Sequence, residues 1–317
     1  MTYRVLVTAT NYSELCKEAK ALLLENGCDV IENDFGRPMT FDELKDRVAD
    51  VDAVVAGVDD WNEDVFKIAP NLKAIARFGV GVDNIDIETA RKYGISVTNA
   101  AGGNSNAVAE LTVGLIISAM RSVPQLHAST REGKWDRFVG DEIINRKIGI
   151  LGFGNIAQSI AKKLQGFDVD VMAYDKFPNM AAAEKLGVTM VDADTVVAEA
   201  DVLCMMLPSL KETHHFMNAE TFAKMKDGAY FINTARGALV DEAALAEALT
   251  GGKLRAAAID VYETEPTSVD NPLFSIPNIL TTPHTAAETY ETYHGVGLIT
   301  AQAVLDVLAG KTPKNLL

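Results

Sequence analysis

The sequence has 317 residues, of which 48% are hydrophobic and 23% charged, an ordinary globular balance that excludes disorder and provides for two domains. Its formal net charge of −15 at pH 7 argues against nucleic acid and anionic membrane surfaces as partners. The charge does not exclude small anionic substrates, because these respond to the local potential inside a cleft.

The first hundred residues alternate short β-branched runs with helical patterns. Residues 13–27 have helical periodicity, which ends at Gly27. Strands are predicted at residues 3–9, 52–57, 72–78 and 95–99. Alternation of this kind predicts a parallel sheet with helices on both faces, which places the chain in the α/β class.

A second run of strands and helices follows a long helix predicted over residues 104–123. That helix is apolar on more than one side, so we expect it to be largely buried. A last helix is predicted over residues 286–309, ending at Gly310. The strands between them are predicted at residues 147–153, 170–175, 201–207, 228–234, 255–260 and 278–282. The chain therefore contains two α/β units, which divide near residue 100.

Targeting and redox signals are weak in this sequence. The first residues, MTYRVLVTAT, lack the charged, apolar and small regions of a signal peptide, and no apolar run approaches the roughly eighteen residues of a membrane span. Cys16, Cys28 and Cys204 form no CxxC pair, so we expect reduced, buried thiols in a cytoplasmic protein. Cysteine and histidine residues do not cluster at ligand spacing, and no metal site is predicted.

A dinucleotide-binding fingerprint follows the first strand of the second unit. Gly152, Gly154 and Ala157 form the pattern G-x-G-x-x-A at the start of an amphipathic helix. Gly152 permits a tight turn, and Gly154 lets a pyrophosphate approach the backbone at the helix N-terminus. Asp175 ends the next strand, where a carboxylate accepts hydrogen bonds from ribose hydroxyls and repels the 2′-phosphate of NADP, so NAD is the predicted cofactor. The alternative is a tight strand–helix turn with an ordinary strand-end aspartate.

Other oxidoreductase classes lack their motifs here. No Tyr-x-x-x-Lys occurs at any of the eight tyrosines, which excludes the short-chain dehydrogenases, and zinc alcohol dehydrogenases need cysteine ligands that are absent. No P-loop is present, so phosphoryl transfer is unsupported. The fingerprint lies in the middle of the chain, which predicts that the nucleotide-binding domain is inserted into another domain.

Three side chains suited to reducing a 2-keto acid follow three of the later strands. In open parallel sheets the carboxyl ends of the strands bind ligands, so Arg236, Glu265 and His284 are expected to converge there. Arg236 offers a planar donor fork for the substrate carboxylate and carbonyl. His284 can give a proton to the carbonyl oxygen as hydride arrives from NADH, and can take it back in the reverse direction.

Two predicted neighbours of His284 have opposite effects on the stability of its imidazolium form. The dipole of the helix that it precedes disfavours imidazolium by about 0.3–1 kcal/mol. A carboxylate within about 4–6 Å favours imidazolium more strongly, and Glu265 is expected to supply it and to hold the ring orientation. Alternatively, Glu265 caps a turn, Arg236 pairs with a surface acid and His284 is solvated.

Seven stretches together resemble the D-2-hydroxyacid dehydrogenase family, specifically its phosphoglycerate dehydrogenase-like branch. They are RFGVGVDNIDIETA, VTNAAGGNSNAVAEL, REGKW, KIGILGFGNIA, NTARGALVDEAAL, AAIDVYETEP and TPHTAAE, and the similarity runs over nearly the whole chain. The resemblance implies two Rossmann- or flavodoxin-like lobes with parallel sheets, the NAD-binding lobe being inserted into the substrate-binding lobe. The implied boundaries are residues 1–100 and 287–317 for the substrate-binding domain and residues 101–286 for the NAD-binding domain.

The resemblance also implies an activity, the interconversion of a small D-2-hydroxy acid and its 2-keto acid. Arg236, Glu265 and His284 take the catalytic positions, with Glu263 as the rival of Glu265. The residues predicted to bind the cofactor are Gly152, Gly154, Asn155, Ile156, Asp175, Pro208, Thr234 and Asp260, the last of which would hold the nicotinamide carboxamide. Those predicted to bind substrate are Val80, Gly81, Asn104 and Arg236. A homodimer is implied, formed through the helix at 104–123 and the arm that carries Trp135.

Departures from the family pattern bear on the substrate. Phosphoglycerate-specific members resemble VRS where this chain has Val55, Ala56 and Gly57, so the phosphate-binding arginine is missing there. We therefore expect glyoxylate, hydroxypyruvate or another small keto acid, with 3-phosphoglycerate dehydrogenase as an alternative. The sequence ends after GKTPKNLL, and no C-terminal regulatory domain is expected. Oxidation of phosphite or formate, and a non-catalytic NAD-sensing protein like the corepressor relatives, are further alternatives.

Overall fold

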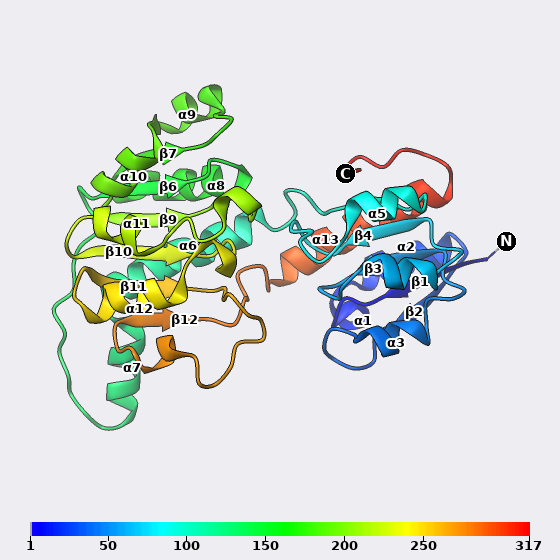
Figure 1. Ribbon diagram of the computed structural model, residues 1–317, viewed down its shortest axis with the longest axis horizontal. Coiled ribbons are helices and arrows are strands. Elements are labelled where there is room, and N and C mark those ends of the chain that lie inside the picture. The colour runs from blue at the N-terminus through cyan, green and yellow to red at the C-terminus, as the bar shows by residue number, and fades with distance from the viewer. Residues whose placement is uncertain (1) are drawn as a thin grey trace. The chain divides into compact units, whose positions relative to one another are not determined.

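The computed structural model describes residues 2–317. In it the chain forms two compact units (Figure 1). The discontinuous unit contains the residues up to Asn104 together with Glu288–Leu317. The inserted unit is the continuous segment Ser105–Ala287. The predicted α/β class with two parallel sheets is confirmed.

The discontinuous unit has a five-stranded parallel sheet in the order β2-β1-β3-β4-β5. This is the strand order of flavodoxin-like doubly wound folds. The strands are β1 (Tyr3–Val7), β2 (Cys28–Glu32), β3 (Ala53–Ala56), β4 (Ala74–Arg77) and β5 (Ser96–Thr98). Sequence patterning missed β2, an edge strand that carries two acidic residues and has little apolar alternation.

Helices cover both faces of this sheet. One face packs against α1 (Tyr12–Leu15), α2 (Lys17–Glu25) and α13 (Tyr290–Leu308), so the last helix of the chain completes the core begun by the first strand. The other face packs against α3 (Phe41–Lys45), α4 (Glu63–Lys67) and α5 (Ile87–Lys92). The single helix predicted over 13–27 was wrong, because Cys16 leaves the helical conformation at φ −116° and ψ 40°.

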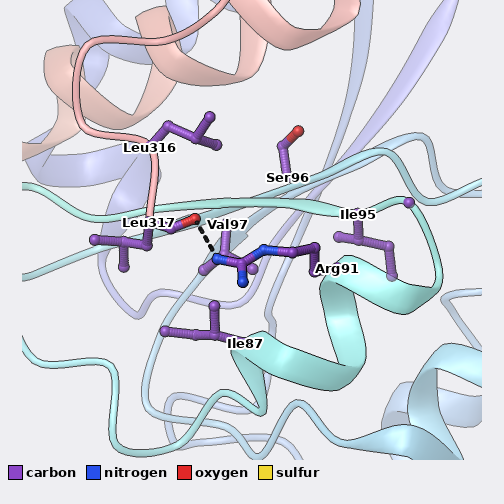
Figure 2. Close-up of a pocket in the computed structure, with 8 residues that line it drawn as sticks. Ile87, Arg91, Ile95, Ser96, Val97, Leu316 and Leu317 are labelled. Carbon is purple, nitrogen blue, oxygen red and sulfur yellow. Dashed lines mark hydrogen bonds between the residues drawn. The ribbon is translucent and has the colours of Figure 1, made fainter.

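The end of the described chain returns to the free edge of β5. The backbone N–H of Leu317 donates to the carbonyl of Val97 at 2.9 Å, and Leu316 forms an antiparallel bridge with Thr98. Figure 2 shows the small pocket that results, of about 230 Å³, where Arg91 Nη2 donates to the Leu317 carbonyl at 3.4 Å. The last residues therefore pair with a strand edge that would otherwise expose unpaired backbone groups.

The inserted unit has a seven-stranded parallel sheet in the order β12-β11-β10-β9-β6-β7-β8. The order reverses between β6 and β9, and ligands of such sheets bind at the carboxyl ends of the strands beside that point. The strands are β6 (Lys147–Leu151), β7 (Asp170–Tyr174), β8 (Thr189–Met190), β9 (Val202–Met205), β10 (Ala229–Asn233), β11 (Leu254–Ile259) and β12 (Ile279–Thr281).

Two helical layers enclose this second sheet. One core lies against α6 (Ser105–Met120), α8 (Asn155–Leu164) and α9 (Met180–Leu186). The opposite core lies against α10 (Ala193–Glu199), α11 (Ala219–Lys224) and α12 (Glu242–Thr250). Short 3₁₀ turns occupy Gln165–Phe167, Lys211–Thr213, Gly237–Leu239 and Pro272–Ser275.

The long helix predicted over 104–123 ends earlier than expected. Ser122 takes a left-handed conformation, φ 50°, which separates α6 from α7 (Val123–Arg131) with a bend of 66°. Among residues 2–317, no single helix has the length and apolar composition to cross a bilayer, although this bent pair meets both when taken together.

The last helix begins later than predicted. Thr289 caps α13 through a bond from the backbone N–H of Thr292 to its hydroxyl, so the helix starts at Tyr290 and not at residue 286. His284 thus lies six positions before the helix, and the dipole effect falls off within the first turn. The predicted opposition between that dipole and the imidazolium form of His284 was therefore wrong.

Candidate active site

The glycine loop after β6 has the geometry that a phosphate cradle requires. Gly152 adopts φ 97°, and a Cβ there would lie 2.5 Å from the carbonyl oxygen of Met206, so only glycine fits. A Cβ at Gly154 would meet nothing within 4 Å, which leaves open space above the backbone at the start of α8. Asn155 and Ile156 form the first turn of that helix, where N–H groups lack intrahelical acceptors. The loop therefore fits a dinucleotide pyrophosphate.

Asp175 joins the glycine loop to the end of β7. Its Oδ2 accepts from the backbone N–H of Phe153 at 2.7 Å, and its Oδ1 accepts from the N–H of Phe177 at 2.8 Å. Two fixed donors hold the carboxylate, and each oxygen keeps a further lone pair for ribose hydroxyls. The neighbouring Lys176 lies 3.4 Å from Glu212, which offsets its charge.

The remaining predicted cofactor residues fall at the ends of β9, β10 and β11. Pro208 is exposed after β9, and its carbonyl accepts from the hydroxyl of Thr213 at 2.7 Å. Thr234 is buried after β10, and its hydroxyl lies 2.8 Å from that of Thr112 in α6. Asp260 follows β11 and is completely buried. These three positions therefore differ widely in how accessible they are.

The loop after β10 presents Arg236 and is folded by its own polar groups. The buried side chain of Asn233 donates to the carbonyl of Arg236 at 2.9 Å and accepts from the N–H of Ala235 at 3.0 Å. The guanidinium of Arg236 donates to the Ala235 carbonyl at 2.7 Å. Gly237 then packs so closely that a Cβ would lie 1.9 Å from the carbonyl carbon of Tyr262. The Arg236 loop is thus built against the backbone that follows β11.

Glu265 and His284 meet directly. His284 Nδ1 lies 2.6 Å from Glu265 Oε2, and their side chains are 43% and 35% exposed. The rival carboxylate, Glu263, points elsewhere: it lies 3.0 Å from His215 Nε2 and accepts from the backbone N–H of Glu242 at 3.0 Å. The structure therefore brings together two of the three predicted catalytic side chains through a bond that leaves His284 Nε2 available.

The charge of Arg236 reaches the same carboxyl group. Burial raises the pKa of Glu265. The hydrogen bond and charge of His284, the backbone N–H of Tyr262 and the charge of Arg236 together lower that pKa by more than burial raises it. The net result is a pKa below the ordinary value, so Glu265 is ionised at neutral pH. An anionic Glu265 can only accept a hydrogen bond, so it fixes the proton of the neutral His284 ring on Nδ1.

Tyr262 makes contacts within the site that the sequence did not predict. Its backbone N–H donates to Glu265 Oε1 at 2.9 Å, and its hydroxyl donates to the carbonyl of Thr282 at 3.0 Å. It therefore links the loop of Glu265 to the loop of His284, while its backbone abuts Gly237. Its position inside the sequence motif AAIDVYETEP was the available signal, but the motif alone does not indicate these long-range partners.

The predicted substrate residues outside Arg236 belong to the discontinuous unit. Val80 and Gly81 follow β4, and the carbonyl of Val80 accepts from the side chain of Asn99 at 2.9 Å. Asn104 is the last residue of this unit's first segment. Within residues 2–317, no group of three or more His, Cys, Asp or Glu side chains is placed to hold a metal ion.

Comparison with known proteins gives a consistent set of relatives. Residues 113–286 match the model described as D-isomer specific 2-hydroxyacid dehydrogenase, NAD binding domain. The chain is 41% identical to D-3-phosphoglycerate dehydrogenase of Archaeoglobus fulgidus over 95% of its own length and 57% of the relative's. It is 39% identical to hydroxypyruvate reductase of Thermotoga maritima, covering 81% of this chain and 85% of the relative.

Solved structures agree with these sequence relatives. The fold matches NAD-dependent formate dehydrogenase from Staphylococcus aureus in complex with NAD with a TM-score of 0.87 and 26% identity, over 100% of this chain and 99% of that one. The chain spans little more than half the length of the D-3-phosphoglycerate dehydrogenases that it matches.

Proposed function

The chain belongs to the D-isomer specific 2-hydroxyacid dehydrogenase family, and from this premise we propose that it interconverts a small D-2-hydroxy acid and its 2-keto acid. The cofactor is NAD, which when bound as NADH supplies the hydride. The observation that carries the proposal is the 2.6 Å contact between His284 Nδ1 and Glu265 Oε2, beside the loop of Arg236. Because Nδ1 is bonded to Glu265, a proton is held and released at one atom of the pair, His284 Nε2.

Each side chain has a separate task in this proposal. Because Nδ1 of His284 faces Glu265, Nε2 is the atom that gives a proton to the substrate's carbonyl oxygen and recovers it in reverse. The guanidinium of Arg236 binds the substrate carboxylate through paired donors. The ionised Glu265 accepts the hydrogen bond from Nδ1 and so holds the imidazole ring in one orientation.

For the substrate we favour glyoxylate, hydroxypyruvate or another short keto acid. The end of β3 and the next residue read Val55, Ala56 and Gly57, which places no cation where the resemblance puts a phosphate-binding arginine. The 39% identity to a hydroxypyruvate reductase supports the same choice. The 41% identity to a D-3-phosphoglycerate dehydrogenase favours the second candidate, oxidation of 3-phosphoglycerate.

We infer that the protein works as a homodimer in the cytoplasm. Between α7 and β6, Trp135, Phe138 and Val139 are 84%, 52% and 88% exposed, a concentration of apolar surface that is typical of an interface. Light scattering tests the dimer, and a monomer at micromolar concentration would overturn it.

The proposed cytoplasmic location rests on the three buried cysteines, which form no disulfide. The acidic net charge argues against nucleic acid or membrane surfaces as partners.

The function is tested by following NADH absorbance against a panel of 2-keto acids that includes 3-phosphohydroxypyruvate. We expect turnover of at least one small keto acid, and a loss of at least a hundredfold in kcat for His284→Ala at unchanged NADH affinity. Tight NADH binding without turnover on any keto acid would overturn the proposal and favour the NAD-sensing alternative. Equal turnover by the variant would remove His284 from its role.

A further inference from the structure

The segment of residues 311–317, which we call the tail, is bonded to the residue that follows β5. The backbone N–H of Asn99 donates to the carbonyl of Asn315 at 3.4 Å, and Asn315 Nδ2 donates to the Asn99 carbonyl at 3.1 Å. Leu316 forms an antiparallel bridge with the neighbouring Thr98. A single residue of the tail therefore occupies both backbone groups of Asn99.

The side chain of Asn99 reaches a loop at the carboxyl end of β4. Asn99 Nδ2 donates to the carbonyl of Val80 at 2.9 Å. The next backbone N–H, that of Ala100, donates to the carbonyl of Gly79 at 2.8 Å. Two successive carbonyl groups of the loop are therefore held by two successive residues after β5.

The bond to the Val80 carbonyl fixes the direction of the N–H group that follows it. The peptide between Val80 and Gly81 is planar and trans, so its N–H points away from its C=O. Among residues 2–317, the backbone N–H groups of Val80 and Gly81 have no hydrogen-bond acceptor, and both residues are half-buried. Successive N–H groups without a partner suit an anion, in agreement with the predicted role of both residues in binding substrate.

We propose that Asn315 is a positioning residue for the substrate, acting through Asn99 on the peptide between Val80 and Gly81. The inference rests on the proposed function, because the ligand of these N–H groups is the carboxylate of the keto acid. Without the Asn315 amide, the Asn99 carbonyl loses its donor, and the Asn99 side chain no longer holds the Val80 carbonyl in one orientation. The effect falls on substrate binding and not on hydride or proton transfer, because these bonds lead from the tail to the Val80 loop.

Steady-state kinetics separates positioning from a general effect on folding. We expect Asn315→Ala to raise the KM for the keto acid about three- to tenfold, the effect of losing one hydrogen bond, with kcat and the Kd for NADH unchanged. Lys314→Ala is the matched control, because this exposed neighbour lies outside the bonds to Asn99, and its KM should equal that of the wild type. A lower kcat or Tm in Asn315→Ala at unchanged KM would overturn the proposal.

A double variant shows whether Asn315 acts through Asn99. Asn99→Ala removes the donor to the Val80 carbonyl and should by itself raise KM about tenfold or more. If the two residues act in one series of bonds, adding Asn315→Ala to Asn99→Ala raises KM no further. Two effects that multiply in the double variant would contradict this series.

A readout by NMR does not depend on turnover. The Gly81 backbone amide resonance, identified by its absence from Gly81→Ala, should shift in Asn315→Ala and stay in place in Lys314→Ala. The side-chain amide resonance of Asn99, identified by its absence from Asn99→Ala, should shift in Asn315→Ala as well. If both resonances keep their wild-type positions in Asn315→Ala, the positioning role is wrong. If the wild type turns over no keto acid, the proposed function fails while these resonances still decide whether the tail fixes the Val80 loop.

Discussion

Replacing Glu265 by Gln tests the acid–base pair most directly. The substitution keeps the size of the side chain and removes the charge that faces His284 Nδ1 at 2.6 Å. Partly exposed ion pairs contribute about 0–1 kcal/mol, whereas hydrogen bonds to a charged group contribute about 1.5–3 kcal/mol. With the two side chains 43% and 35% exposed, we take an intermediate of about 1–2 kcal/mol, which at 1.36 kcal/mol per tenfold predicts a loss of about 5–30-fold in kcat/KM.

The lowered pKa of Glu265 also predicts how its contribution changes with pH. Because the folded pKa of Glu265 is lowered, its contribution to stability is present above the ordinary carboxyl pKa of 4.5 and is lost as pH falls through the folded value. The wild-type profile should therefore show no limb from Glu265 above about pH 4.5. Initial rates of NADH oxidation between pH 5 and pH 9 show whether such a limb is present.

The matched control is Glu263→Gln, two positions away. Its carboxylate lies against His215 and the N–H of Glu242, not against His284, so we expect less than a threefold change in kcat/KM. A Glu265→Gln enzyme within twofold of the wild type at every pH would refute the reasoning. So would an equal loss in both variants, because the effect would then belong to the loop and not to the pair.

Four further predictions concern other parts of the site and the core. Arg236→Lys loses the planar fork and should lower kcat/KM for the keto acid by about 10–100-fold while the Kd for NADH stays constant, as titration of each ligand would show. Gly237→Ala places a Cβ 1.9 Å from the Tyr262 carbonyl and should destabilise the inserted unit by about 1–3 kcal/mol, read as a lower Tm; an unchanged Tm would contradict that packing. Asp175→Ala should raise NADPH use relative to NADH, and an unchanged ratio would contradict its cofactor role. Burial raises the pKa of Cys16 and of Cys204 to about 12, so alkylation at pH 8 should be slow in the native protein and fast after unfolding.

The fold class and most strands of this protein were predictable from apolar periodicity. Strands β6, β7 and β9–β12 sit in the predicted positions because buried parallel strands are short, continuous apolar runs. The edge strand β2 escaped prediction because an edge needs little apolar material on its free side. Helix breaks at Cys16 and Ser122 also escaped, since each is a single backbone conformation that periodicity over a longer window averages away.

The candidate site was predictable as a set of residues but not as a set of contacts. The sequence order places Arg236, Glu265 and His284 after strands that prove to be adjacent, which is why they could be grouped. The choice of Glu265 over Glu263 as the partner of His284 depends on where two carboxylates of one loop point. The hydrogen bonds that Asp260 accepts from the His284 segment likewise depend on residues 22 to 26 positions away, which no local pattern encodes.

The shared core of β1 and α13 has a consequence for the order in which the protein is made. Tyr3 donates its hydroxyl to the carbonyl of Leu308, 305 positions later, and Cys16 donates its thiol to the carbonyl of Tyr293. The first five strands thus leave the ribosome without the helix that covers one of their faces, whereas Ser105–Ala287 is synthesised as one uninterrupted segment. The inserted unit can therefore fold before α13 has been synthesised. Until then the apolar face around Val5 and Val7 is uncovered, which exposes it to aggregation and to binding by chaperones.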